Sequence, residues 1–470
     1  MVKIALIKPP QTYADWYKRP VLGISYLSSF CEKNGFSSRI FDAAFHGWSG
    51  KELAYHVETY RPDIIGITAM THEITHAARL SADLKNKLAA PVVIGGSHVT
   101  ALPERTLSEF PEFDYGIRGE GEKSFLELLR CLFEKGSGLE AAAIPGLIFR
   151  NNGSVKVNEP RPWLTEGELE QLPYPAFEHY YGGNRNALSG KHSYYVMFSA
   201  RGCPYSCAFC MQVLGRQVRP FSAARICREI EYAISRYGAH TIDFADEIFL
   251  FDSHRTLEIL NMMISMGLPE RIRWSGLTRA NMVNHDLIAL AKRAGCFRLE
   301  MGVESGDNEL LKAIGKKITV EQVKNAVAVI KRNGISLGTY FILGHPNETK
   351  ETLRKTVRLA AALNTDTIAV GVMVPYPGTA IYTMAKQGEG GYRLLSENWA
   401  DYDKYGGKAL ELRDIPYEDL LKLQKRAYLG LYLRNFRVID LLNFIMQRRR
   451  GLYFFLQKKI RSFFRIKRRG

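Results

Sequence analysis

The stretch RGCPYSCAFC, residues 201–210, carries the strongest pattern in this chain. Cys203, Cys207 and Cys210 lie within eight residues, separated by three and then by two residues. A loop this short can place three thiolates on three corners of a cubane iron–sulfur cluster, whereas such clusters commonly take four cysteines. The spacing therefore predicts a 4Fe-4S cluster with one iron left open to a small molecule.

Two other uses of these cysteines fit less well. A structural zinc site takes four ligands, usually as two Cys or His pairs, and no second pair is near in the sequence. A disulfide framework is disfavoured because the total of seven cysteines is odd and the others are scattered. The remaining cysteines are expected to be small buried hydrophobic residues: Cys31, Cys131, Cys227 and Cys296.

The motif Cys-x3-Cys-x2-Cys, with Phe209 directly before its last cysteine, resembles the signature of the radical S-adenosylmethionine (SAM) enzymes. The resemblance implies that the three cysteines hold the cluster and that the open iron binds the amino and carboxylate groups of SAM. It also implies reductive cleavage of SAM to methionine and a 5′-deoxyadenosyl radical. An electron donor of the flavodoxin or ferredoxin type is therefore an expected partner.

Strands and helices alternate after the cysteine loop, which predicts βα units and a parallel sheet. The predicted strands are 194–199, 241–244, 272–275, 298–302, 336–343 and 367–372. The predicted helices are 223–237, 255–266, 285–294, 320–333 and 349–363. Six such strands match the partial (β/α)6 barrel of radical SAM enzymes. In barrel enzymes the catalytic groups follow the carboxyl ends of strands, where the cysteine loop also falls.

The same resemblance implies SAM contacts at the ends of later strands. Asp246 and Glu247 are expected to accept from the SAM ammonium group, although either could instead cap the following helix. Glu304 and Ser305 are expected at the ribose. The alternative for Glu304 is an ion pair with Arg279.

A turn near the adenine is implied at Gly344 and Pro346. The family pattern has glycine where this chain has Asn347, a mild exchange because asparagine tolerates positive φ. Residues 375–379, PYPGT, follow the last predicted strand. They either line a substrate cavity or form a simple turn, and the turn is favoured.

The first part of the chain also alternates strands with helices, in a pattern that favours a flavodoxin-like doubly wound sheet. The predicted strands are 2–7, 38–41, 64–68, 92–94 and 115–117. The predicted helices are 22–34, 51–60, 74–88 and 123–133, with a shorter one at 103–109. In such sheets a ligand lies beyond the carboxyl ends of the strands.

Unusual residues follow each of these strands. Any one of them is explained by a tight turn, but five such places at one sheet edge favour a ligand, and a glycine pair lets the backbone approach a bulky one. The candidate contacts are Pro10, Asp42, Thr68, Gly95, Gly96, His98, Gly119 and Glu120.

A doubly wound domain with these turns, ahead of a radical SAM motif, resembles the cobalamin-binding domain of the B12-dependent radical SAM class. Methyltransferases and a bacteriochlorophyll ring cyclase belong to that class. Some other cobalamin proteins ligate cobalt through Asp-x-His-x-x-Gly, whereas this chain has His46 four residues after Asp42. We therefore do not assign His46 as a cobalt ligand, and the resemblance implies cobalamin bound without a protein imidazole.

Four regions follow from these patterns. Residues 1–135 are the expected cobalamin-binding domain and 136–190 a linker with a β-hairpin at 146–157. Residues 191–386 are the expected radical SAM partial barrel. Residues 387–470 are expected to be a C-terminal region that is helical from about residue 392 and ends in a basic, aromatic tail.

The basic charge is concentrated in that tail. The net charge is +16, and residues 434–470 carry +11 of it, with twelve Lys or Arg and one acid. Basic clusters between aromatic residues favour peripheral contact with an anionic membrane, while a solvated tail, partner docking and nucleic-acid binding are alternatives. Nucleic acid is the least favoured. The short apolar run 2–7 does not fit a signal peptide or a membrane span, so we expect a cytoplasmic location.

The leading hypothesis is a cobalamin-dependent radical SAM enzyme that methylates an unactivated carbon through methylcobalamin, on a small or lipid-linked metabolite. One alternative keeps both cofactors but performs cyclisation or rearrangement without methyl transfer. Another is an RNA-modifying radical SAM enzyme. A non-enzymatic metal scaffold is the remaining possibility.

Overall fold

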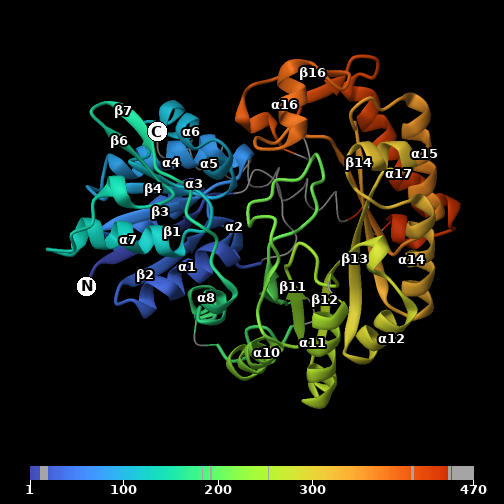
Figure 1. The fold of residues 1–470 in the computed structure, drawn as a ribbon, viewed down its shortest axis with the longest axis horizontal. Coiled ribbons are helices and arrows are strands. Elements are labelled where there is room, and N and C mark those ends of the chain that lie inside the picture. Colours follow the sequence, from blue (N-terminus) through green and yellow to red (C-terminus); the bar gives the residue numbers. More distant parts are fainter. Residues whose placement is uncertain are drawn as a thin grey trace, which may run out of the picture.

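Two sheets, each flanked by helices, organise the chain and face each other across its middle (Figure 1). The computed structural model describes residues 1–10, 19–182, 184–190, 193–251, 253–403, 407–442 and 446. Most of the predicted basic tail therefore lies outside the described residues.

Within the described residues, the first sheet has seven strands in the order β2-β1-β3-β4-β5-β6-β7. They are β1 (Lys3–Lys8), β2 (Ser37–Asp42), β3 (Ile64–Thr68), β4 (Val92–Gly95), β5 (Tyr115–Ile117), β6 (Leu147–Asn151) and β7 (Ser154–Val157). The first five are parallel, which confirms the flavodoxin-like order.

The helices of this domain cover both faces of the sheet. They are α1 (Leu22–Lys33), α2 (Ala43–His46), α3 (Gly50–Tyr60), α4 (Ile74–Lys85), α5 (Ser97–Ala101), α6 (Pro103–Glu109) and α7 (Glu122–Phe133). Alternate residues of β1 enter two separate cores, with Leu6 in one and Ile7 in the other. Burial on both faces explains why the predicted strands are continuous apolar runs.

The hairpin predicted at 146–157 is confirmed as β6 and β7, with Asn152 and Gly153 at positive φ in its turn. It pairs antiparallel with β5 and so continues the first sheet beyond residue 135. Two short helices, α8 (Glu166–Glu170) and α9 (Glu178–Tyr181), follow it toward the second sheet.

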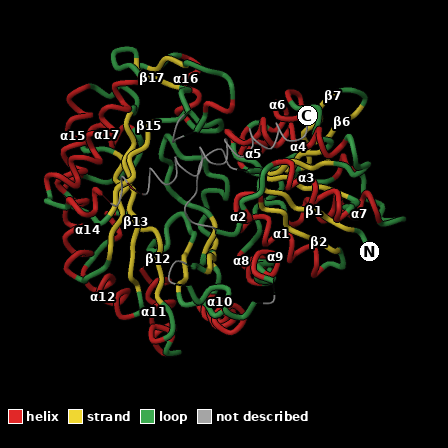
Figure 2. The backbone as a smooth tube through the Cα atoms, turned by 180° about the vertical axis from the view of Figure 1, so that it is seen from behind, coloured by secondary structure: helices red, strands yellow, loops and turns green. Residues whose placement is uncertain are grey.

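The second sheet, counted over the described part of the chain, has six parallel strands in the order β15-β14-β13-β12-β11-β8. They are β8 (Tyr195–Met197), β11 (Thr241–Phe244), β12 (Arg273–Thr278), β13 (Cys296–Glu304), β14 (Ser336–Leu343) and β15 (Thr367–Val372). The connecting helices are α10 (Ala223–Tyr237), α11 (Ser253–Ser265), α12 (His285–Arg293), α13 (Asn308–Ala313), α14 (Val320–Arg332) and α15 (Lys350–Ala362). Helices α12, α14 and α15 lie on the outer side, away from the first sheet (Figure 2). The predicted open barrel is confirmed.

The C-terminal region needs one correction, because it is not helical throughout from residue 392. After α16 (Ala380–Gln387), strands β16 (Tyr392–Leu394) and β17 (Leu410–Leu412) form an antiparallel pair. Helix α17 (Tyr417–Arg434) then packs against α15 and β15. Each strand is only three residues long, and buried aromatic or leucine side chains are typical of amphipathic helices as well. The sequence pattern therefore does not distinguish these strands from a helix.

Three of the scattered cysteines, Cys31, Cys227 and Cys296, are buried as expected, and Cys131 is partly buried. Among the described residues, no helix combines the length and the apolar character that crossing a membrane requires.

Candidate active site between the two sheets

The cysteine loop projects from the second sheet as a closed hairpin. Its stems are β9 (Ala200–Arg201) and β10 (Arg219–Pro220), which pair antiparallel. Gly202 has φ +97° and lies against the backbone of Gln217, so a side chain at 202 would collide with the opposite stem. The turn after α13 supports the tip, where the Ala208 amide donates to the Ile314 carbonyl at 3.0 Å.

None of the three loop cysteines is fully buried, in contrast to Cys31, Cys227 and Cys296. Cys203 and Cys207 are half-buried and Cys210 is exposed. Removal of the Cys210 thiol from water by the surrounding chain, together with the neighbouring Cys207 and Cys203, raises its pKa to about 11. The three thiol groups therefore lie close enough for their charges to influence one another.

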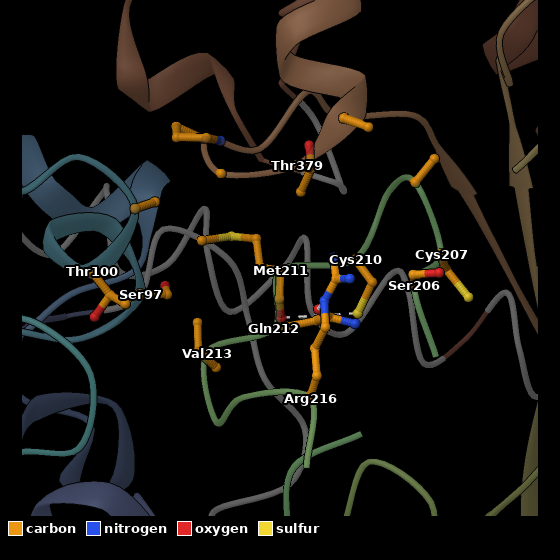
Figure 3. Close-up of a pocket in the computed structure, with 15 residues that line it drawn as sticks. Ser97, Thr100, Ser206, Cys207, Cys210, Met211, Gln212, Val213, Arg216 and Thr379 are labelled. Carbon is orange, nitrogen blue, oxygen red and sulfur yellow. Dashed lines mark hydrogen bonds between the residues drawn. The ribbon is translucent and has the colours of Figure 1, made fainter. Parts of the chain in front are cut away.

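A cavity of about 310 Å³ lies between this loop and the first sheet (Figure 3). Three segments line it: α5 of the first domain, the cysteine loop, and the turn before α16. The lining residues are Ser97, Thr100, Ala101, Ser206, Cys207, Ala208, Cys210, Met211, Gln212, Val213, Arg216, Pro377, Gly378, Thr379 and Ala380. The PYPGT segment thus contributes to the wall, the alternative that the sequence disfavoured.

Arg216 is the cationic residue in this lining. Its Nε donates to the Gln212 side-chain oxygen at 2.5 Å, and the Gln212 amide donates in turn to the Tyr205 carbonyl. Arg216 and Cys210 both line the cavity, and Figure 3 shows the two side chains in it.

The two acids after β11 have different roles. Asp246 is buried and accepts from the Ser199 amide at 2.6 Å and from the Ser199 hydroxyl, with Arg255 3.8 Å away. It therefore fixes the approach to the cysteine loop rather than capping a helix. Glu247 has a buried carboxylate oxygen with no partner among the described residues, and burial raises its pKa. Its charge also acts on Cys203.

Glu304 pairs with Lys316 and not with Arg279, which corrects the predicted alternative. The Glu304 carboxylate lies 2.6 Å from the Lys316 ammonium, and both side chains are buried. Glu304 has φ +69°, an uncommon conformation for a residue other than glycine. Gly302 leaves room for the pair, because a Cβ there would lie 2.7 Å from Lys316 Nζ. Arg279 instead stacks on Tyr205 at 3.5 Å.

Ser305 bonds within the protein. Its hydroxyl lies 3.3 Å from that of Thr356 and accepts from the Asp307 amide at 3.2 Å. In the described structure it anchors the end of β13 to α15.

The predicted turn after β14 is present. Gly344 has φ +95° and Asn347 has φ +56°, as expected for asparagine in place of glycine. Glu348 folds back to accept from the amides of Gly344 at 2.6 Å and His345 at 3.0 Å, and burial raises its pKa to about 7. Pro346 packs below Gly390, in the loop before β16.

The edge of the first sheet brings together some of the predicted contacts. Gly96 has φ +101°, and a Cβ there would lie 2.7 Å from the Ala69 carbonyl oxygen and 2.9 Å from the Thr68 hydroxyl. Gly95 ends β4 beside it, and Pro10 follows β1 in a half-buried position. The Gly119 amide donates to the Thr100 hydroxyl at 3.0 Å, which ties the loop after β5 to the cavity wall.

Comparisons with known proteins agree with this arrangement. Residues 17–129 match the B12 binding domain model and residues 197–360 match the Radical SAM superfamily model. An uncharacterized methyltransferase of Pyrococcus horikoshii is 32% identical over 443 residues, covering 92% of this chain and 93% of that protein. The chain belongs to the cobalamin-dependent radical SAM enzymes.

Two further similar proteins share less of their sequence with this chain. An anaerobic magnesium-protoporphyrin IX monomethyl ester cyclase of Cereibacter sphaeroides is 27% identical, covering 77% of this chain and 60% of that protein. The structure of the radical SAM methyltransferase TsrM from Kitasatospora setae, with cobalamin and a 4Fe-4S cluster bound, has a TM-score of 0.71 at 19% identity and covers 90% of this chain and 91% of that chain. That likeness shows the shared fold.

The described residues fit the cofactors of this family, which are a 4Fe-4S cluster, SAM and cobalamin. Three neighbouring thiols, of which Cys207 and Cys210 line the cavity, suit a cluster with a free iron. The orphan oxygen of Glu247 is a ready acceptor. Gly95 and Gly96 have no side chain, so a bulky ring can approach the backbone closely at the edge of the first sheet. The small hydroxyl side chains of Ser97 and Thr100 leave further room for it.

For three predicted cofactor contacts, the structure supplies other partners. Asp42 is buried, caps α2 by accepting from the Phe45 amide at 2.9 Å, and has its pKa raised to about 6 by burial. His98 is buried edge-on against Trp399, with ring centroids 4.9 Å apart, and does not line the cavity. Glu120 is engaged by two arginines, Arg201 and Arg219. Asp42 and Glu120 thus have polar partners within the fold, whereas both ring nitrogens of His98 are buried without a hydrogen-bond partner among the described residues. The cofactor contacts of these three residues stay predictions.

His46, which we did not assign to cobalt, ends α2, and its ring stacks on Trp48 at 4.3 Å between centroids.

Sequence reasoning missed several residues of the site. Arg201 and Arg219 flank the cysteine motif, and Lys316 follows a short helix, so only the folded chain shows where their charges meet. Ser97 and Thr100 flank His98 after β4, where only Gly95, Gly96 and His98 were predicted as contacts. The one available signal was the placement of two arginines at the two ends of a cysteine loop.

Proposed function

We propose that this enzyme transfers a methyl group from SAM to an unactivated carbon of a small or lipid-linked metabolite. The cavity carries the proposal, because Ser97 and Thr100 of the cobalamin-binding domain face Cys207 and Cys210 across it. A ligand in that volume reaches both domains. Relatives with related activities include the hopanoid C-3 methylase of Methylococcus capsulatus, 24% identical over 394 residues, covering 80% of this chain and 71% of that protein.

The protein's part in the reaction is to hold and orient. Cys203, Cys207 and Cys210 hold the cluster, and the unpartnered oxygen of Glu247 accepts from the SAM ammonium. The buried pair of Glu304 and Lys316 fixes the end of β13 beside them. When bound, the cluster, SAM and cobalamin together supply radical formation and a transferable methyl group.

The cavity wall also fits radical chemistry. The described residues that line it include no carboxylate and no histidine. Methyl transfer to a carbon radical requires neither a nucleophilic side chain nor a general base, in contrast to polar methyl transfer to a heteroatom. We infer an external electron donor of the flavodoxin or ferredoxin type as partner.

Methyl-deuterated SAM tests the proposal. The anaerobically reconstituted enzyme, a reductant and labelled SAM are incubated with small-molecule and lipid fractions of cells, and new masses are sought. We expect a product that gains one deuterated methyl group with the wild type and with Cys296→Ala, but not with Cys210→Ala. Deoxyadenosine release without any labelled product would contradict methyl transfer.

Ring closure or rearrangement is the second candidate. It is favoured by the similarity to the magnesium-protoporphyrin cyclase of Cereibacter sphaeroides, whose alignment of 373 residues covers 77% of this chain. A product that appears only with SAM but contains no deuterium would support it in place of methyl transfer.

A peripheral membrane contact is the proposed further partner. Phe436 is 91% exposed, Ile439 75% and Leu442 54%, directly after α17 and beside Arg434 and Arg437. Apolar side chains next to a tail of charge +11 suit an anionic bilayer.

Sedimentation with vesicles tests this contact. We expect binding to phosphatidylserine vesicles, weaker binding to neutral ones, and loss of binding in Phe436→Ser/Ile439→Ser. Equal binding by that variant, or binding to RNA but not to vesicles, would overturn the membrane proposal.

A further inference from the structure

The cysteine loop is joined to the first domain by a buried network of four charged side chains. Arg201 Nη1 lies 2.9 Å from Glu120 Oε1, and Arg201 Nη2 lies 2.8 Å from Glu122. Arg219 Nη1 lies 2.8 Å from the other oxygen of Glu120. All four side chains are at least 94% buried, so water does not weaken these contacts.

The two arginines stand at the two ends of the loop that carries the cysteines. Arg201 in β9 is directly opposite Arg219 in β10. Two like charges facing each other across a strand pair repel, so this pairing requires the two carboxylates for compensation. Because Glu120 contacts both arginines, a single carboxylate closes the base of the hairpin as well as joining it to the first domain.

Both arginines also pack against aromatic rings, and Arg219 donates to backbone carbonyls. The Arg201 guanidinium lies 5.1 Å from the ring centre of Tyr26 in α1, and that of Arg219 lies 5.4 Å from Trp163. Arg219 additionally donates to the Leu164 carbonyl at 2.8 Å. Each guanidinium is therefore held in one orientation, which a flexible surface pair would not require.

The same network reaches the cavity wall. Glu120 follows Gly119, whose amide donates to the Thr100 hydroxyl, and Thr100 lines the cavity. A short path of contacts therefore runs from the cysteine loop through Glu120 to the edge of the first sheet. Buried ion pairs add little net stability compared with apolar packing, and their best-supported use is to select one geometry.

We propose that Glu120 is a positioning residue that sets the distance and orientation of the cluster-binding loop relative to the cobalamin-binding edge. It acts through Arg201 and Arg219 and does not itself touch either cofactor. The inference concerns the two cofactors of the family and is independent of which group is transferred or which metabolite accepts it.

The test compares Glu120→Gln with a matched control. Glutamine keeps the shape and the acceptor oxygen but removes the charge shared by the two arginines. Glu168→Gln is the control, because Glu168 in α8 pairs with Lys123, three residues after Glu120, and both of these side chains are more than a third exposed. Both proteins are reconstituted anaerobically with iron, sulfide and hydroxocobalamin.

Pulsed electron paramagnetic resonance then measures the distance between the reduced cluster and cob(II)alamin. We expect Glu120→Gln to retain iron and corrinoid but to show a broader and shifted distance distribution, while Glu168→Gln matches the wild type. An unchanged distribution in Glu120→Gln would overturn the proposal. Failure of methyl transfer alone would leave this readout unaffected.

Hydrogen exchange of the apoprotein covers the cases in which Glu120→Gln does not fold or corrinoid is not retained. Arg219→Lys keeps the charge and shortens the reach, so it is the second variant. We expect amides in 202–218 and 97–101 to exchange about tenfold faster than in the wild type, since a buried charge-assisted bond is lost. Faster exchange confined to 202–218 would contradict a link to the cavity edge.

Discussion

The strand-end edges of the two sheets differ in how their buried carboxylates are satisfied. At the second sheet, one oxygen of Glu247 and one of Glu348 have no partner among the described residues. At the first sheet, Glu73 pairs with Lys8 at 2.6 Å, and Glu120 pairs with two arginines. The difference indicates that the second edge keeps carboxylate acceptors for a small polar ligand. The first edge keeps no such acceptor at Glu73 or Glu120 and offers backbone, small side chains and the unpartnered ring nitrogens of His98 instead.

The largest expected effect follows from removing a cluster thiol beside the second sheet. Cys210→Ala is expected to lose the cluster, because three cysteines are the minimum set in this loop. Iron and sulfide content after anaerobic reconstitution measures this. Cys296→Ala, at a buried cysteine of β13, should retain full iron; retention of full iron by Cys210→Ala would show that the cluster is held elsewhere.

A pH series on Glu348 should give the next largest effect. Burial raises the pKa of Glu348 in the folded protein to about 7, from the ordinary value of 4.5 for a glutamate. Its contribution to stability is therefore complete below about pH 4.5 and is lost as pH rises toward 7, with an upper limit of about 3 kcal/mol. Glu348→Gln stays neutral and should flatten this part of the curve.

Denaturant unfolding of both proteins between pH 5 and pH 8 measures the difference. We expect the variant to gain stability relative to the wild type as pH rises. A constant difference across this range would mean that Glu348 remains ionised, held by the amides of Gly344 and His345.

The unpartnered oxygen of Glu247 should contribute to SAM binding and little to folding. Glu247→Ala is expected to weaken SAM binding by about 2 kcal/mol, or roughly 30-fold, which is the range for a hydrogen bond to a charged group. Equilibrium binding to the reconstituted protein measures it, with Glu258→Ala on the exposed side of α11 as control. Equal SAM affinity in both variants would remove Glu247 from the site.

The first edge is probed by comparing two glycines with positive φ. A Cβ at Gly96 would collide with the Ala69 carbonyl, whereas a Cβ at Gly47 meets nothing within 4 Å. Gly47→Ala should cost about 1 kcal/mol from backbone conformation alone. Gly96→Ala should cost about 1 kcal/mol more and release corrinoid. Equal thermal unfolding and equal corrinoid retention would show that the close approach has no role.

Much of this architecture is predictable from the sequence because its signals are local. The three cysteines, the alternation of strands and helices, and the Asn347 turn each depend on neighbours within a few residues. The strand pair β16 and β17 was missed because its short strands share their apolar content with a helical pattern.

The partners of Glu120, Glu304 and His98 were not predictable for a different reason. Glu120 meets Arg201 and Arg219, which are 81 and 99 positions away in the sequence. The sequence offered Arg279 as a partner for Glu304, and only the packed loops show that Lys316 pairs with it. Where a buried charge is neutralised is therefore a property of tertiary structure.

The central claim is that two cofactors meet between the two sheets, and cofactor stoichiometry tests it most directly. The protein is reconstituted anaerobically with iron, sulfide and hydroxocobalamin, desalted, and assayed for iron, corrinoid and deoxyadenosine release with SAM and reductant. The account predicts about four irons and one corrinoid per chain, with SAM cleavage. A full cluster that cleaves SAM without any retained corrinoid would contradict it and leave the first domain without its proposed role.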